Sequence, residues 1–336
     1  SNYKACCPFH NEKTPSFVVS ETKQFFTCFG CGAKGDVIGF VEKYYNLDFQ
    51  EACEKLAAQY GITLEKTRGN DRYDRYYEVN RLAARFFYDA FTKQANQGYA
   101  YMKQRGISPA ILKKFGIGYA DESWDSLYKY LTSQGVDKKI MLELGLISES
   151  KGKCYDKFRN RVIFPIINTN GKVIGFGGRA ISPDDNPKYL NSAESAVFQK
   201  KNNLYGLNLS RQNLSKSGNI ILVEGYMDVI SLYQSGIDNV AASLGTALTE
   251  NQAKLIKRYT KNVVLSYDAD GAGRTAALRG LDILKAADCK VKVLHVTDGK
   301  DPDEYVKKNG KSAFLKLVED ALPYGDYKLE AAKEGL

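Results

Sequence analysis

Three apolar runs of β-strand character in the last third of the chain are each followed by carboxylates. The runs cover 220–223, 263–267 and 291–296, and the acidic residues after them are Glu224, then Asp268 and Asp270, then Asp301 and Asp303. Helical stretches at 226–234 and 272–287 lie between the runs, so we expect buried parallel strands whose carboxyl ends share one sheet edge. Five carboxylates on one edge repel one another unless divalent cations neutralise them. The sequence therefore predicts a metal site of the kind that phosphoryl transfer uses.

Length and cysteine content set the broad class. A chain of 336 residues with 43% hydrophobic content can bury two or three cores. No apolar run approaches the roughly 20 residues of a membrane span, and we expect a cytoplasmic protein that uses no membrane. In a reducing compartment the seven cysteines are better interpreted as thiols or metal ligands than as a disulfide framework.

The net charge of +9 is unevenly distributed. Residues 66–217 carry 26 basic and 14 acidic side chains, whereas the segments before and after them are slightly acidic. Such a density of positive charge favours a polyanionic partner, with an affinity that falls as salt rises. A merely solvated basic surface is the alternative on charge alone.

Two paired motifs near the N-terminus have the spacing of metal ligands. Cys7 and His10 are separated by two residues, as are Cys28 and Cys31, and 17 residues lie between the pairs. Four such ligands complete a tetrahedral zinc shell, so we expect one structural zinc ion. Two short strands are expected between the ligand pairs, at 16–20 and 24–27. Cys6 competes with Cys7 for the site, but the spacing to His10 favours Cys7.

Aromatic and basic side chains alternate around these motifs. Aromatics interleaved with cations suit stacking on unpaired bases and contact with phosphates. We expect about half of the rings to cover the ribbon's own core instead. The four aromatic side chains are Phe17, Phe25, Phe26 and Phe29, and the cations are Lys13, Lys23 and Lys34.

Two short segments resemble nucleotide-binding motifs but do not meet the requirements of those motifs. Gly310-Lys311-Ser312 resembles the end of a P-loop, but Tyr305 stands where its leading glycine should be. The run 175–180 matches a dinucleotide-binding fingerprint by letter, yet the proline-containing segment 181–187 after it cannot open a helix. The sequence also predicts a hairpin, with strands at 161–167 and 172–176 around Asn170-Gly171.

Taken together, these motifs resemble the bacterial DNA primase family over essentially the whole chain. The zinc-binding domain of that family is matched by 7–17 and 28–32. Its basic RNA-polymerase motifs are matched by 161–165, 175–179 and 187–192, and its Toprim metal site by 223–228, 268–270 and 301–303.

The resemblance implies a multi-domain α+β fold. It comprises an N-terminal zinc ribbon, a mixed α/β basic subdomain, a Toprim α/β parallel-sheet subdomain and the start of a C-terminal helical region. The expected bounds are 1–65 for the zinc ribbon, 66–75 for a linker, 76–217 for the basic subdomain, 218–311 for the Toprim subdomain and 312–336 for the truncated helical region.

The resemblance also implies an activity and its residues. A primase is a DNA-directed RNA polymerase that makes short RNA primers from ribonucleoside triphosphates on single-stranded DNA at replication forks. Glu224, Asp268 and Asp270 would hold two or more catalytic Mg²⁺ ions, or Mn²⁺, with Asp228, Asp301 and Asp303 in support; whether Glu224 acts instead as a general base is left open. The basic residues facing nucleotide or template would be Arg105, Arg179, Lys188 and Lys200, with Lys201 as the alternative to Lys200.

Two features separate the chain from the family pattern. The family has a short segment before the zinc motif and a C-terminal domain that binds the replicative helicase, so we expect a fragment, monomeric, that lacks the helicase contact. Two other functions remain as rivals. One is a Toprim strand cleaver of the nuclease or topoisomerase type, and the other is a zinc-ribbon DNA-binding module without catalysis.

Overall fold

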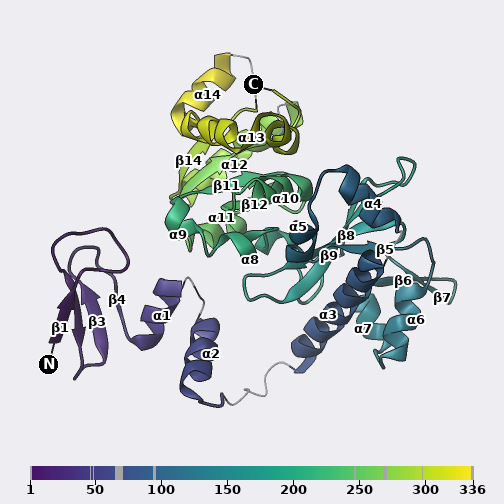
Figure 1. Ribbon diagram of the computed structural model, residues 1–336, viewed down its shortest axis with the longest axis horizontal. Coiled ribbons are helices and arrows are strands. Elements are labelled where there is room, and N and C mark those ends of the chain that lie inside the picture. Colours follow the sequence, from purple (N-terminus) through teal and green to yellow (C-terminus); the bar gives the residue numbers. More distant parts are fainter. Residues whose placement is uncertain are drawn as a thin grey trace. The chain divides into compact units, whose positions relative to one another are not determined.

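The computed structural model describes residues 2–45, 47, 49–64, 71–93, 96–245, 247–267, 271–296 and 298–333. Two compact units account for the chain, Ser1–Gly69 and Asn70–Leu336 (Figure 1). Within the described ranges, no helix combines the length and the apolar character that crossing a bilayer requires.

The first unit is a small antiparallel sheet followed by two helices. Its strand order is β1-β2-β3-β4, and the β2–β3 turn lies at the predicted place, with Phe17 opposite Cys28. The buried side chains of the sheet are few, so a bound metal would supply much of this unit's stability. The elements are β1 (Asn2–Ala5), β2 (Phe17–Ser20), β3 (Phe25–Cys28), β4 (Lys34–Gly35), α1 (Val37–Tyr45) and α2 (Phe49–Tyr60).

The aromatic side chains of the ribbon divide as the sequence predicts. Phe17 and Phe26 are buried and stack at a centroid distance of 5.2 Å. Phe25 and Phe29 are exposed, at 41% and 78%. Two of the four rings therefore belong to the core and two face solvent.

The first half of the second unit is built on the four-stranded antiparallel sheet β10-β9-β8-β5. Helix α3 covers one face of this sheet, where Phe87 packs on Phe176. The elements are α3 (Asp71–Thr92), α4 (Gln97–Gln104), α5 (Pro109–Lys114), β5 (Gly118–Ala120), α6 (Ser126–Ser133), α7 (Lys138–Glu143), β6 (Ile147–Ser150), β7 (Lys153–Asp156), β8 (Arg161–Ile167), β9 (Val173–Ala180) and β10 (Tyr189–Asn191).

Helix α3 begins earlier than the sequence predicts. Residues 66–70 of the expected linker lie outside the described residues, but 71–75 are helical. Residues 72–74 are exposed at the start of the helix, where Arg72 pairs with Glu143 of α7 and Arg75 pairs with Glu78. A polar sequence alone does not distinguish such an exposed helical turn from a linker.

The glycine-rich run that resembles a dinucleotide fingerprint lies in strand β9, in agreement with its rejection as a nucleotide motif. Strand β9 pairs with β8 across the Asn170-Gly171 turn and also with β10 on its other side. Gly177 is packed against the ring of Tyr226, so that a Cβ at this position would lie 2.4 Å from a ring carbon. The glycine therefore permits close approach of a neighbouring side chain.

The second half of this unit contains the predicted parallel sheet. Its strand order is β12-β11-β13-β14-β15, in which the first four strands are parallel and β15 is antiparallel. The elements are η1 (Lys200–Asn202), α8 (Leu207–Ser210), α9 (Leu214–Ser217), β11 (Ile220–Val223), α10 (Tyr226–Gln234), β12 (Val240–Ala242), α11 (Glu250–Lys257), β13 (Asn262–Leu265), α12 (Gly271–Ala286), β14 (Lys290–Val293), α13 (Pro302–Glu319), β15 (Leu322–Pro323) and α14 (Tyr324–Lys333).

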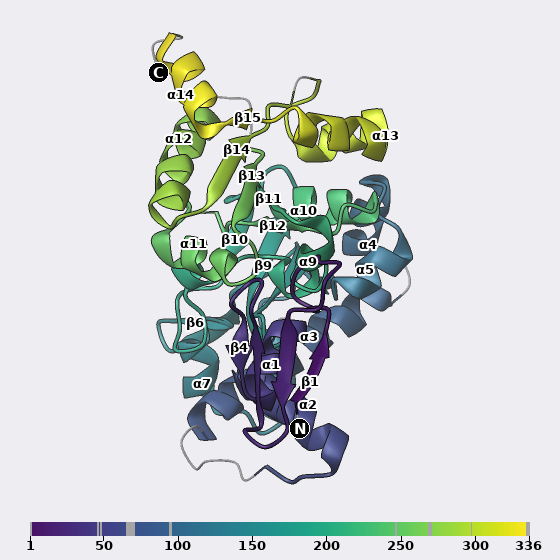
Figure 2. The ribbon, with the colours of Figure 1, turned by 90° about the vertical axis from the view of Figure 1, so that its left-hand side faces the viewer.

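Helices cover both faces of the parallel sheet. Ile221 and Val223 of β11 belong to the core shared with α10 and α13, whereas Ile220 and Leu222 belong to the core shared with α11 and α12. Figure 2 shows α11 and α12 on one side of the strands and α10 and α13 on the other. Because side chains alternate along a strand, a strand buried on both faces is continuously apolar, as the sequence predicts.

The chain beyond residue 311 remains part of the same sheet assembly. The expected boundary falls beside a kink in α13 at Gly310, where φ is 78°. After the helix, β15 pairs with β14, and Tyr327 of α14 enters the core beside α12. The predicted helical region therefore packs on the parallel sheet and contributes an edge strand that the sequence did not indicate.

Candidate metal centres and nucleic-acid interface

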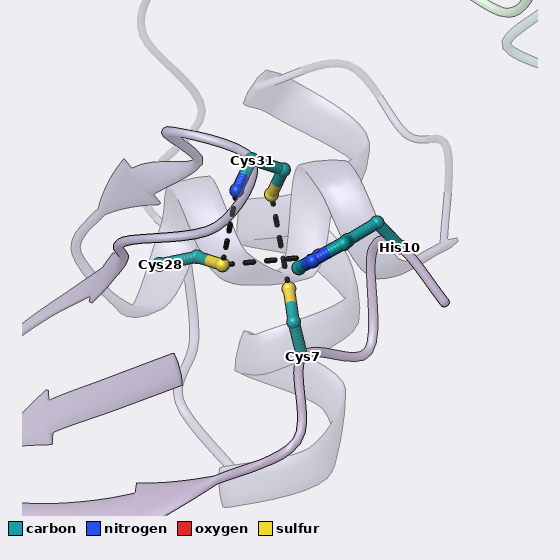
Figure 3. A group of neighbouring side chains, drawn as sticks. All are labelled: Cys7, His10, Cys28 and Cys31. Carbon is teal, nitrogen blue, oxygen red and sulfur yellow. Dashed lines mark hydrogen bonds between the residues drawn. The ribbon is translucent and has the colours of Figure 1, made fainter. Parts of the chain in front are cut away.

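Cys7, His10, Cys28 and Cys31 converge at one end of the ribbon (Figure 3). Their ligand atoms all lie within 4.8 Å of one another, and Cys6 is exposed outside the group. The Cys7 and Cys31 sulfurs are 3.9 Å apart, and Cys28 Sγ is 3.8 Å from His10 Nδ1. Ligands at the usual zinc bond lengths of a tetrahedral shell are about 3.5–3.8 Å apart. The donor set and its spacing therefore fit a structural zinc ion.

Glu12 organises this group and was not identified from the sequence. Its Oε1 accepts hydrogen bonds from the backbone N–H of Cys7 at 2.7 Å and of Ser16 at 3.0 Å. Its Oε2 lies 3.1 Å from His10 Nε2, which leaves Nδ1 facing the cysteines. A carboxylate on the far nitrogen of a histidine fixes the ring's tautomer and orientation for metal binding. The signal available in the sequence was an acidic residue two positions after a predicted histidine ligand.

The ionisation of the thiols also suits a cation. Burial opposes ionisation of Cys28, but the Ser16 hydroxyl and backbone N–H groups at 30 and 31 lower the pKa of this thiol to about 6. Burial raises the pKa of Cys7 to about 11, so a positive charge beside this thiol would favour its ionisation near neutral pH. A metal ion would provide that charge.

Glu224 lies at the carboxyl end of β11, where the sequence predicts it. Strands β11 and β13 are parallel neighbours, and the N–H of Ser266 donates to the carbonyl of Leu222 at 2.8 Å. Burial raises the pKa of Tyr267, at the end of β13, and the nearby Glu224 carboxylate raises it further. Glu224 and Tyr267 therefore lie at the same sheet edge. Asp268 and Asp270 themselves lie outside the described residues.

Asp228 is part of the turn that carries Glu224. It is the third residue of α10, and its Oδ2 accepts a hydrogen bond from the N–H of Gly225 at 3.0 Å. Its Oδ1 accepts a hydrogen bond from the N–H of Asp303 at 3.2 Å. Asp228 therefore connects the first acidic segment with the third.

Asp301 and Asp303 have different surroundings although they are two residues apart. Asp301 is half-buried and caps α13, with Oδ1 accepting from the N–H of Glu304 at 2.8 Å. Asp303 is 2% exposed and is in contact with two cations, Arg105 and Lys307, each at 2.5 Å. Among the described residues, which exclude Asp268 and Asp270, the acidic side chains do not by themselves form a group close enough to hold one ion.

The basic residues predicted to face nucleotide or template have unequal exposure. Arg105, which follows α4, is bound to Asp303. Arg179 of β9 lies over the rings of Tyr101 and Tyr189, at 5.5 and 5.3 Å from their centroids. Arg105 therefore contacts the third acidic segment directly. Arg179 is connected to the first acidic segment through Tyr189, whose ring stacks on Tyr226.

Lys188 and the Lys200-Lys201 pair lie on connecting segments. Lys188 is exposed just before β10, Lys200 is half-buried, and Lys201 is exposed. Side chains of α11 hold the short helix η1, because Gln252 Nε2 donates to the carbonyl of Lys200 at 3.0 Å. The backbone at Lys200 is thus held by α11, and of the two lysine side chains that of Lys201 is the more exposed.

A cavity of about 570 Å³ beside the antiparallel sheet contains residues that the sequence analysis missed. Trp124, the single tryptophan of the chain, is 64% exposed and lies under the Arg159 guanidinium, 4.3 Å from its ring centroid. Tyr155 meets the Trp124 ring edge-on at 5.9 Å, and Lys157 and Arg161 also line the cavity. An exposed aromatic platform among cations is a typical surface for single-stranded nucleic acid. Its sequence signal was a lone tryptophan and three cations within 157–161.

Three family profiles match successive parts of the chain. They are a CHC2 zinc finger over residues 1–72, the N-terminal domain of the DNA primase catalytic core over 86–211, and a Toprim-like domain over 221–306. The zinc-finger match and the cysteine–histidine group together support a bound Zn²⁺ ion. The Toprim match implies a divalent metal in the second unit.

Curated relatives and solved structures agree with these matches. The chain is 49% identical to the DNA primase of Clostridium acetobutylicum over its whole length and spans 57% of that protein. It is 42% identical to the DNA primase of Halalkalibacterium halodurans, again over 57% of the relative. The chain thus spans little more than half of these two relatives.

Two solved structures extend the comparison. The zinc-binding and RNA polymerase domains of Aquifex aeolicus primase match with a TM-score of 0.72 and 40% identity, over 99% of this chain and 82% of that one. A DnaG primase catalytic domain solved bound to single-stranded DNA matches with a TM-score of 0.72 and 34% identity, over 79% and 84% of the two chains. The zinc finger, the catalytic core and the Toprim-like sheet thus occur here in the order and fold of these proteins, and the chain belongs to the bacterial DNA primase family.

Proposed function

We propose that this chain is the zinc-binding and RNA polymerase part of a DNA primase, a nucleotidyltransferase that synthesises short RNA primers on single-stranded DNA. The observation that carries the proposal is the place of Glu224, at the carboxyl end of a parallel strand inside a unit that also contains the basic antiparallel sheet. Ligand and metal sites of open α/β sheets lie at this edge. The proposal therefore rests on the site as well as on the family.

Catalytic metal binding is assigned to the acidic edge. Glu224, Asp268 and Asp270 are the proposed ligands of two or more Mg²⁺ ions, with Asp301 beside them. When bound, Mg²⁺ supplies Lewis acidity and charge neutralisation for in-line displacement at a triphosphate. Glu224 is held by the turn that Asp228 fixes, which keeps its carboxylate oriented before any ion enters.

Template binding is assigned to the cavity around Trp124. Bases would stack on the exposed indole, and phosphates would meet Lys157 and Arg159 beside it. A relative's catalytic domain solved with bound single-stranded DNA supports this partner class. The predicted residues Arg179, Lys188 and Lys200 remain candidates for contacts with the incoming ribonucleotide and its phosphates, because they are cations on the basic half of the same unit.

The zinc unit is proposed to bind DNA rather than to catalyse. Four protein ligands leave no open coordination position, so the zinc is structural. Tyr3, Phe25 and Phe29 are exposed around the ribbon and suit stacking on template bases. Contact with a replicative helicase through a further domain, a monomeric state and a cytoplasmic location at the replication fork belong to the same proposal.

A primer-extension assay tests the function directly. The chain is incubated with a single-stranded template, Mg²⁺ and labelled ribonucleoside triphosphates, and the expected product is short labelled RNA. Asp268→Ala and Asp270→Ala should each reduce synthesis at least a thousandfold while the melting temperature and zinc content stay unchanged, since they remove charge that stabilises the transition state.

Two outcomes would contradict the proposal. Shortened DNA without RNA product would indicate a strand-cleaving Toprim enzyme. Binding to single strands with steep salt dependence but no synthesis at any Mg²⁺ concentration would indicate a zinc-ribbon binding module. As a matched control, Asp282→Asn removes an acidic charge of α12 whose side chain pairs with Lys328 at 2.6 Å, and it should leave synthesis intact.

A further inference from the structure

An ion pair between Arg105 and Asp303 joins the two halves of the second unit. Arg105 follows α4 of the basic half, and Asp303 lies in the first turn of α13 of the parallel-sheet half. The pair is 2.5 Å long, and the Asp303 side chain is 3% exposed against 36% for Arg105. From the sequence, Asp303 was expected to support metal binding and Arg105 to bind nucleotide or template.

The oxygens of Asp303 are committed to protein partners. Oδ1 accepts from the Ser231 hydroxyl and lies 2.5 Å from Lys307 Nζ, while Oδ2 bonds Arg105. A Mg²⁺ ion bound here would displace a cation from a buried carboxylate and leave that cation without its counter-charge, which is strongly unfavourable. Mg²⁺ also keeps several waters in an octahedral shell, for which a fully covered carboxylate offers little room. These contacts do not fit direct ligation by Asp303.

The backbone of Asp303 instead reaches the turn that presents Glu224. Its N–H donates to Asp228 Oδ1 at 3.2 Å, and Asp228 Oδ2 accepts from the N–H of Gly225 at 3.0 Å. Gly225 directly follows Glu224. A displacement of Asp303 would therefore shift Asp228 and, through it, the turn that orients the Glu224 carboxylate.

We infer that Asp303 is a positioning residue rather than a metal ligand, and that Arg105 acts by holding Asp303 rather than by binding nucleotide. The inference rests on the proposed function and changes the roles within it. Glu224, Asp268, Asp270 and Asp301 remain as proposed ligands. Arg105, Asp303 and Asp228 form the support that sets the geometry of Glu224. Catalytic carboxylates need such support because a misplacement of about 0.5 Å weakens a metal site.

Manganese binding separates a positioning role from ligation. Mn²⁺ is titrated into wild type, Asp303→Asn, Arg105→Met and the double variant, and free Mn²⁺ is followed by electron paramagnetic resonance. We expect each single variant to weaken binding three- to tenfold without changing the number of ions bound, and the double variant to be no weaker than either single one. Arg105→Lys, which retains the charge, should recover most of the affinity lost in Arg105→Met.

Two results would overturn the inference. If Asp303→Asn loses a bound ion while Arg105→Met binds as wild type or more tightly, Asp303 is a ligand. If both variants lower the melting temperature but leave Mn²⁺ affinity unchanged, the pair only holds the two halves together. Should Asp303→Asn fail to fold by circular dichroism, Arg105→Met and Arg105→Lys decide the question, because they leave Asp303 and Lys307 in place.

Reference variants keep this test distinct from that of the proposed function. Glu224→Gln marks the effect of losing a ligand, with an expected loss of tenfold or more, and Asp282→Asn controls for removal of a paired acidic charge elsewhere. Primer synthesis by the wild type is measured separately. Its absence would count against the proposed function, whereas the order of Mn²⁺ affinities among the variants would still decide the role of Asp303.

Discussion

The two metal regions of this protein are built in opposite ways. The zinc group draws its four ligands from residues 7–31, at the end of β3 and in the neighbouring loops of one small sheet. The acidic edge draws its residues from 224 to 303 and depends on the packing of separate strands and helices. A local site of the first kind can be predicted from the spacing of its residues, whereas a distributed site forms only when the unit around it folds. Each region should therefore respond differently to loss of its metal and to mutation.

Removal of zinc is expected to have the largest effect and to be confined to the first unit. Chelation, or Cys28→Ser, should unfold residues 1–64, because the binding free energy of a structural zinc, about 10–16 kcal/mol, is folding free energy for such a unit. The second unit has its own extensive cores and should keep its melting transition. Hydrogen exchange resolved by segment measures both responses. Loss of protection throughout residues 71–333 would show that the two regions are not independent.

Glu12→Gln tests whether the local site includes more than its four ligands. The amide keeps the size of the side chain but removes the charge that orients His10, so zinc affinity should fall 10- to 100-fold. A competitive chelator titration gives the affinity. Glu21→Gln provides a control in the same ribbon, since Glu21 lies in the β2–β3 turn away from the ligands. Equal zinc affinity in Glu12→Gln and wild type would restrict the site to the four ligands.

Trp124→Ala tests the other half of the unit that contains the acidic edge, and it has the smallest expected effect. Loss of one stacking platform should weaken binding of a single-stranded oligonucleotide about tenfold, since stacking of one base contributes roughly 1–3 kcal/mol. Fluorescence anisotropy with a labelled oligonucleotide measures this. Trp124→Phe should retain most of the affinity, and the salt dependence should stay as in wild type because no cation is removed. An unchanged affinity in Trp124→Ala would exclude the cavity from template binding.

The sequence predicted local features of the fold well. The grouping of the paired cysteine and histidine residues, the Asn170-Gly171 hairpin and the helix Tyr226–Gln234 follow from spacing or periodicity within a few residues. The structure brings the four cysteine and histidine side chains together and contains the hairpin and the helix. The start of α3 was missed because residues 72–74 are exposed and give no apolar stripe to mark a helix. Strand β15 was missed because two residues at a sheet edge carry no periodic signal.

The candidate site shows the same division between local and non-local information. Glu224 was placed correctly at a strand end, because the apolar run before it marks the strand. The partners of Asp303 were not predictable, because Arg105 is 198 residues away in the chain. The sequence alone also does not distinguish an aspartate that binds a metal ion from one that binds a guanidinium group. The platform at Trp124 and Arg159 likewise joins residues 35 positions apart through packing.

Strand β9 and helix α10 are bound together at Gly177, where the ring of Tyr226 lies against the backbone. We therefore expect that residues 177 and 226 cannot be substituted independently of each other during evolution. A side chain at 177 requires a smaller residue at 226, and a smaller residue at 226 would leave a hole among the rings of Phe164, Tyr189 and Tyr205. The basic sheet and the parallel sheet of this unit are thus expected to be inherited as one block, and exchange of either half between distant relatives should fail first at this contact.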